Sequence, residues 1–66
     1  MKVYIGKPTE AYTGGCVVIA ANNLEEAQRM AEDEMVYNDS VEVSEATDLQ
    51  TTRTEPGVII SELYFE

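Results

Sequence analysis

The sequence contains no histidine, one cysteine and only four basic residues. Without histidine, the chain lacks the side chain that most often acts as a general base near neutral pH. The single cysteine, Cys16, excludes an internal disulfide framework, and without histidine it cannot complete a familiar zinc site. We therefore expect no enzymatic activity, no cofactor and no metal, and we interpret Cys16 as a buried structural thiol.

Long hydrophobic stretches are also missing. No apolar run approaches the roughly 20 residues that a membrane-spanning helix requires, and the first residues, MKVYIGKP, reach glycine and proline before the apolar core of a signal peptide develops. The apolar fraction of 44% is nevertheless ordinary for a globular protein. These features predict a single small domain, residues 1–66, in a reducing, cytoplasmic setting.

The scarcity of basic residues leaves a net charge of −9, which is unevenly distributed along the chain. Residues 1–31 contain three acidic and three basic side chains, whereas residues 32–66 contain ten carboxylates and only Arg53. Binding to nucleic acid requires cations that displace the counterions of the phosphates. We therefore expect no direct contact with nucleic acid or with an anionic membrane, and the charge instead favours a basic protein partner.

Hydrophobic periodicity predicts four strands and one helix, in the order strand, strand, helix, strand, strand. The predicted segments are residues 2–6, residues 16–21, the helix within 22–35, residues 41–47 and residues 57–65. The second strand is apolar on both faces, which indicates a central position in the sheet. Pro56 and Gly57 would close a long hairpin loop between the last two strands. The expected fold class is α+β, a two-layer ββαββ domain with one helix packed on a four-stranded, mostly antiparallel sheet.

The helix is predicted from the segment NNLEEAQRMAEDEM. Asn23 is a favourable N-cap, and Glu26 can reach back to it as in a capping box. The far end breaks the usual rule, because the carboxylates of residues 32–34 lie at the negative end of the helix dipole, where cations are preferred. The apolar stripe of the helix is expected to contain Leu24, Ala27, Met30, Ala31 and Met35.

One helix covers only one face of a four-stranded sheet, so the second face must be open or covered by something else. In the third strand, Val41 and Val43 should face the core while Glu42 and Ser44 face solvent. Tyrosine, apolar and carboxylate side chains together are typical of an interface, although an ordinary half-exposed sheet explains them equally well. The residues expected on the open face are Tyr4, Val17, Ile19, Glu42, Ile60, Glu62 and Tyr64.

Residues 32–48, EDEMVYNDSVEVSEATD, carry seven carboxylates and no basic side chain. Asp39, Glu42, Glu45 and Asp48 follow a three-residue spacing, which on a strand sends successive side chains to opposite faces, so a built calcium site is not expected. The stretch is either a solvated surface that maintains solubility or a binding surface for a basic partner. We favour the second interpretation, because solubility does not require acids at the wrong end of a helix. The predicted partner-binding residues are Glu32, Asp33, Glu34, Tyr37, Asp39, Glu42, Glu45 and Asp48, with Tyr37 as an aromatic anchor.

The segment CVVIAANNLEEAQRMAEDEM, followed by an acidic hairpin, resembles small one-helix, four-stranded proteins of phages and mobile elements, among them anti-CRISPR proteins. The resemblance is one of size, element order and acidity over most of the chain, and it transfers no binding residue. It implies a stoichiometric inhibitor that binds a nucleic-acid-handling protein of the host. In such an inhibitor, an acidic surface imitates the phosphates of a nucleic acid.

A second hypothesis is a self-associating structural module, a homodimer in which the open sheet face or a free edge strand pairs with a second copy. Burying more apolar surface would stabilise so small a core. Two chains of like charge repel each other, so self-association should strengthen as salt rises, whereas binding to a basic partner should weaken. The candidate self-association residues are Tyr4, Ile60, Glu62 and Tyr64.

Overall fold

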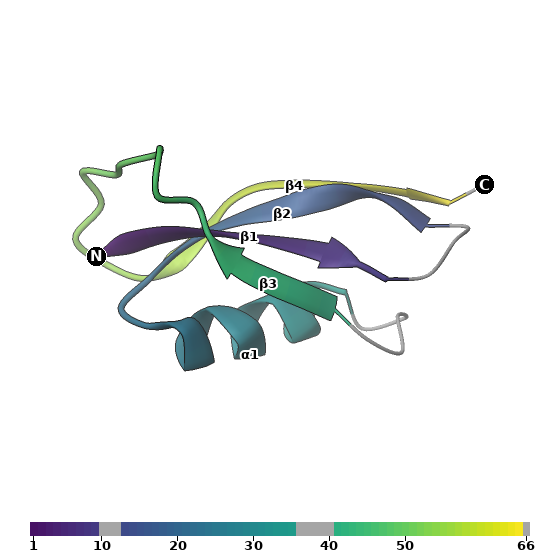
Figure 1. Ribbon diagram of the computed structural model, residues 1–66, viewed down its shortest axis with the longest axis horizontal. Coiled ribbons are helices and arrows are strands. Elements are labelled where there is room, and N and C mark those ends of the chain that lie inside the picture. The colour runs from purple at the N-terminus through teal and green to yellow at the C-terminus, as the bar shows by residue number, and fades with distance from the viewer. Residues whose placement is uncertain (10–12, 36–40, 66) are drawn as a thin grey trace.

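The computed structural model describes residues 1–9, 13–35 and 41–65, which form one helix packed on a four-stranded sheet (Figure 1). The predicted α+β class and the order of the elements are confirmed. The elements are β1 (Lys2–Pro8), β2 (Thr13–Ala21), α1 (Leu24–Glu34), β3 (Val41–Glu45) and β4 (Gly57–Phe65). No helix in these ranges is long and apolar enough to cross a membrane.

The strands lie in the order β3-β1-β2-β4, and every neighbouring pair is antiparallel. The expected central position of β2 is confirmed. The expected hairpin between the last two strands is wrong, because β3 and β4 lie at opposite edges of the sheet. The chain between them therefore has to pass across one end of the sheet, which explains why this connection is long.

The core lies between the sheet and α1. From the helix, Ala27, Ala31 and Met35 are buried in it. Leu24 was expected in the same stripe but is 51% exposed, because it is the first residue of α1, at an end of the helix where its neighbours are exposed as well. Sheet residues buried in this cluster are Tyr4, Val17, Ile19 and Ala21, with Val41, Val43 and Val58 partly buried around them.

The prediction of the open face is wrong for Tyr4, Val17 and Ile19, which are 3%, 0% and 0% exposed beneath the helix. Alternation divides the residues of a strand into two sets, but in the two central strands both sets are apolar, so hydrophobicity does not decide which set the helix covers. The orientation of β3 is as predicted, with Val43 half-buried and Glu42 exposed.

The face opposite the helix is covered at one end by the chain that follows β3. Val3 and Ala20 pair on that face and are 3% and 0% exposed. The N–H of Ala46 donates to the C=O of Val3 at 2.8 Å, and Ala46, Thr47 and residues 49–51 border the same hollow as Val3. These contacts bury one end of a face that was expected to be open.

None of the described residues covers the other end of this face. Ile5, Val18 and Ile60 lie side by side across β1, β2 and β4. Ile5 and Val18 are half-buried, and Ile60 is 49% exposed. Cys16, expected to be a buried thiol, is half-buried at the same end. Beyond Val18 the register shifts, so that Ile59 of β4 has no partner in β2.

Candidate functional site

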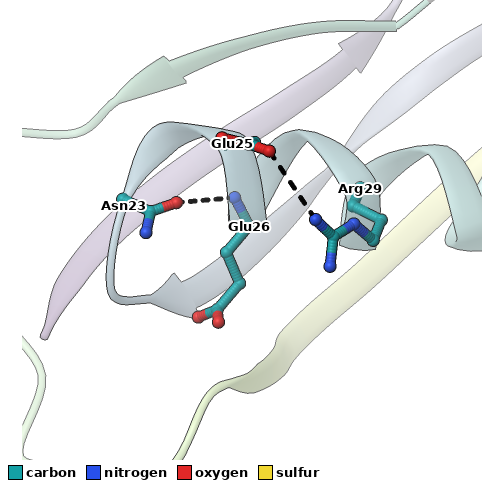
Figure 2. A network of polar contacts seen from close by, with 4 residues as sticks. All are labelled: Asn23, Glu25, Glu26 and Arg29. Carbon is teal, nitrogen blue, oxygen red and sulfur yellow. Dashed lines mark hydrogen bonds and ion pairs between the residues drawn. The ribbon is translucent and has the colours of Figure 1, made fainter.

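The start of α1 is fixed by two hydrogen bonds that both involve Glu26. The Oδ1 atom of Asn23 accepts a hydrogen bond from the N–H of Glu26 at 2.8 Å, as expected for an N-cap (Figure 2). The carboxylate of Glu26 reaches back as well, but it accepts from the N–H of Asn22 at 2.9 Å, one residue before the cap. These hydrogen bonds fix where the helix begins, and the packing of Ala27 and Ala31 on the sheet positions the rest of it.

Three adjacent carboxylates occupy that far end. Glu32, Asp33 and Glu34 are all exposed, and the last turn of the helix contains no basic residue. We refer to these three residues as the acidic helix end. The unpaired carbonyls at a helix C-terminus carry about half a negative charge, so each of these carboxylates costs on the order of 0.3–1 kcal/mol of stability.

Gln28 connects the acidic helix end to the edge of the sheet. Its Nε2 atom donates to the Oε2 atom of Glu32 at 3.1 Å and to the C=O of Val41 at 3.1 Å. Val41 is the first residue of β3. The bond to Glu32 therefore places one carboxylate of the acidic helix end beside the beginning of an edge strand.

In the described ranges, two of the four basic residues form ion pairs, both with other carboxylates. Lys2 lies 3.6 Å from Glu45, and Arg29 lies 3.8 Å from Glu25 one turn earlier on the helix (Figure 2). Lys7 of β1 lies opposite Glu42 in the register of the two strands. Neither ion pair found in the described ranges includes a residue of the acidic helix end. The charge of the acidic helix end is therefore not compensated by a described basic side chain.

The structure does not gather all the predicted partner-binding residues into one surface. In the register of β3 with β1, Glu42 lies opposite Lys7 on the face away from the helix, whereas Glu45 lies opposite Tyr4 on the helix side. Asp48 is exposed in the chain that follows β3. Tyr37 and Asp39 lie outside the described residues. Of the predicted set, Glu32, Asp33 and Glu34 are the ones that the structure holds together.

No group of three carboxylate or cysteine side chains that could hold a metal ion occurs in the portion of the chain that the structure describes. The separation of Glu42 and Glu45 onto opposite faces of β3 agrees with the alternation expected from their spacing. The carboxylates of β3 therefore act as separate surface charges and not as one ligand set.

The candidate self-association residues have mixed positions. Tyr4 is buried under the helix, so its predicted place in an exposed interface is wrong. Ile60 is exposed on β4, and the side chains of Glu62 and Tyr64 lie outside the described part of the chain. Sequence reasoning missed Ile59, which is 39% exposed. The register shift that removes its partner is a long-range feature, and we find no local signal for it in the sequence.

Comparison with protein-family models, with curated protein sequences and with solved structures gives no match to this chain. The resemblance to small phage and mobile-element proteins accordingly stays a prediction.

Proposed function

We propose that this protein is a non-enzymatic binding protein whose acidic helix end contacts a basic surface of a partner protein. The observation that carries the proposal is the concentration of Glu32, Asp33 and Glu34 at the negative end of α1, with no basic residue in the last turn. This arrangement lowers the stability of the helix. A cost to folding without compensation inside the chain is typical of residues retained for binding.

The electrostatic field supports a partner that normally binds nucleic acid. Such proteins present clustered lysine and arginine side chains to the phosphate backbone. Three adjacent carboxylates, reinforced by the helix dipole, have the sign of charge that such a surface attracts, and they accelerate encounter by steering. The resemblance to small phage and mobile-element proteins points to the same partner class, with the protein acting as an inhibitor.

The proposal is tested by capturing a partner from nuclease-treated bacterial lysate on the immobilised protein, eluting with rising salt and identifying the eluted proteins. The affinity of the purified partner is then measured for the wild type and for the variant E32Q/D33N/E34Q. We expect the variant to bind at least tenfold more weakly and with a flatter salt dependence. The partner should also release bound nucleic acid when the wild-type protein is added.

A matched control has the same total charge as a variant of the acidic helix end. The variant E25Q/E55Q removes two exposed carboxylates elsewhere in the chain and is compared with D33N/E34Q. It should bind the partner nearly as well as the wild type, because the acidic helix end is intact. Equal weakening of both variants would mean that overall charge, and not this site, determines binding, and the proposal would be rejected.

A further inference from the structure

Among the described strands, the order β3-β1-β2-β4 leaves β4 with one unpaired edge. Strand backbones alternate their hydrogen-bonding groups between the two neighbours. The C=O of Val3 faces β3, because it accepts a hydrogen bond from Ala46. The neighbouring Tyr4 therefore faces β2. By the register of β2 with β1 and with β4, the backbone groups of Ile60 and Glu62 then face β2, while the N–H and C=O of Ser61 point away from the sheet.

The two edges of the sheet differ in their protection against pairing with another strand. The β3 edge is short, carries two carboxylates, and has the C=O of Val41 already bonded to Gln28. The β4 edge runs over nine residues without lysine, arginine or proline and has Glu62 as its single carboxylate. Ile59 and Ile60 on this strand are 39% and 49% exposed. Exposed edges of this length with so little charge are the ones that pair with other chains.

One end of β4 also lacks support from the rest of the domain. β1 pairs with β2 only as far as Gly6 and Val17, whereas β2 and β4 continue to pair as far as Thr13 and Phe65. Among the described residues, this end is therefore a two-stranded ribbon, and Figure 1 shows it projecting beyond α1. A two-stranded ribbon alone is only marginally stable in water, and a third strand stabilises it.

We propose that β4 pairs antiparallel with β4 of a second copy of this chain, so that two four-stranded sheets form one continuous sheet around a two-fold axis. The occupant of this edge has to be a strand with little charge and with an unpaired edge of its own, and β4 has both properties. A two-fold axis at Ser61 makes Ser61 its own partner and sets Glu62 opposite Ile60 of the second copy. The two Glu62 positions are then not directly opposed, which avoids a repulsive like-charge pair.

The geometry also limits the repulsion between two chains that each carry −9. In the combined sheet, the two β3 strands are the outermost strands and lie seven strand spacings apart. At about 4.8 Å per spacing this is about 34 Å, several times the Debye length of about 8 Å at physiological salt. Through the bond of Gln28 to Glu32, the acidic helix end lies beside β3 as well. Most of the described carboxylates in residues 32–66 are thus far from the axis.

The test is the molar mass of the full chain by sedimentation equilibrium, over a range of protein concentration and from low to half-molar sodium chloride. We expect the mass to rise with concentration towards twice the 7.3 kDa of the single chain, and to rise further with salt. The variant Ser61→Pro removes an N–H that points away from β2, so it blocks the edge without removing a bond of the internal ladder. It should remain monomeric.

The matched control is Glu45→Pro, which alters an outward-facing position on the opposite edge and should dimerise like the wild type. If Ser61→Pro does not fold, as judged by circular dichroism, Ile60→Glu and Ser44→Glu replace the pair. Ser44 and Ile60 belong to one row on the same face but to opposite edge strands, and both changes add one negative charge. The expected result is loss of the dimer in Ile60→Glu alone, because the new carboxylate lies directly opposite Glu62 of the second copy. A wild type that stays at 7.3 kDa in all conditions, or an edge variant that dimerises as tightly as the wild type, would overturn the proposal.

Discussion

A Cβ atom placed on Gly6 would lie 3.0 Å from the Cβ of Ala31, so these two residues set the distance between the sheet and the helix. Gly6 is buried in the middle of β1, and Ala31 is fully buried in the middle of α1. Neither position has room for a larger side chain. The pair therefore determines how closely the two layers of the core can pack.

The first prediction concerns this contact. Gly6→Val should lower the free energy of unfolding by about 1–3 kcal/mol, because the added side chain forces the helix away from the sheet. Urea unfolding, followed by circular dichroism, measures the change. As a control, Lys7→Val introduces the same residue one position later on the exposed side and should change the stability by less than about 0.5 kcal/mol. Equal effects at both positions would contradict the close packing of Gly6 against the helix.

The N-cap gives the second prediction. Asn23→Ala removes the acceptor for the N–H of Glu26 and should cost about 1 kcal/mol. In a domain of this size, such a loss lowers the melting temperature by about 4–8 °C. Asn23→Ser supplies another side-chain oxygen and should keep most of the stability. If the serine variant had the same melting temperature as the alanine variant, the side-chain cap would not be what fixes the start of α1.

Gln28 gives the third prediction, because it joins the helix to an edge strand. Gln28→Ala should cost about 1 kcal/mol, since it leaves the C=O of Val41 without its side-chain donor. The neighbouring Arg29→Ala removes only an exposed ion pair with Glu25 and should cost less than about 0.5 kcal/mol. Urea unfolding of the two variants side by side separates these values. If Gln28→Ala lowers the free energy of unfolding no more than Arg29→Ala does, the hydrogen bond of Gln28 to Val41 does not stabilise the fold.

Local signals were sufficient to predict the helix and the number of strands. The signals for the helix are local: a cap residue, a hydrophobic period of 3.6 residues and exposed acidic residues. They predicted the start at Asn23 and the burial of Ala27 and Ala31. The arrangement of the sheet was not predictable in this way. Pairing of β3 with β1 joins residues far apart in the sequence, and no turn residue announces it. The acidic helix end was predicted because it belongs to the helix.

The choice of the face covered by the helix could have been made from one residue. Tyr4 and Gly6 belong to one set of alternating positions in β1, and Val3 and Ile5 belong to the other. A glycine within a strand often marks a close approach by another element. Gly6 therefore indicates that the set containing Tyr4 lies beneath the helix, although hydrophobicity alone does not distinguish the two faces of β1.

The last prediction links stability to the proposed function. Asp33→Lys places a cation at the negative end of α1 and should raise the free energy of unfolding by about 0.3–1 kcal/mol at low ionic strength. The gain should shrink as salt is added, because the interaction is exposed and screened. The same variant should bind a basic partner more weakly, since it reverses one charge of the acidic helix end. Unfolding and binding are measured on the same preparation.

Glu25→Lys is the matched control for this prediction, because it makes the same change of charge at the positive end of the helix. It should lower the stability and leave partner binding nearly unchanged. If Asp33 were retained only for solubility, Asp33→Lys would not weaken binding more than Glu25→Lys does, because both substitutions change the net charge by the same amount. If Asp33→Lys both stabilised the fold and left binding intact, the cost of carboxylates at this end of the helix would have no functional explanation in partner binding.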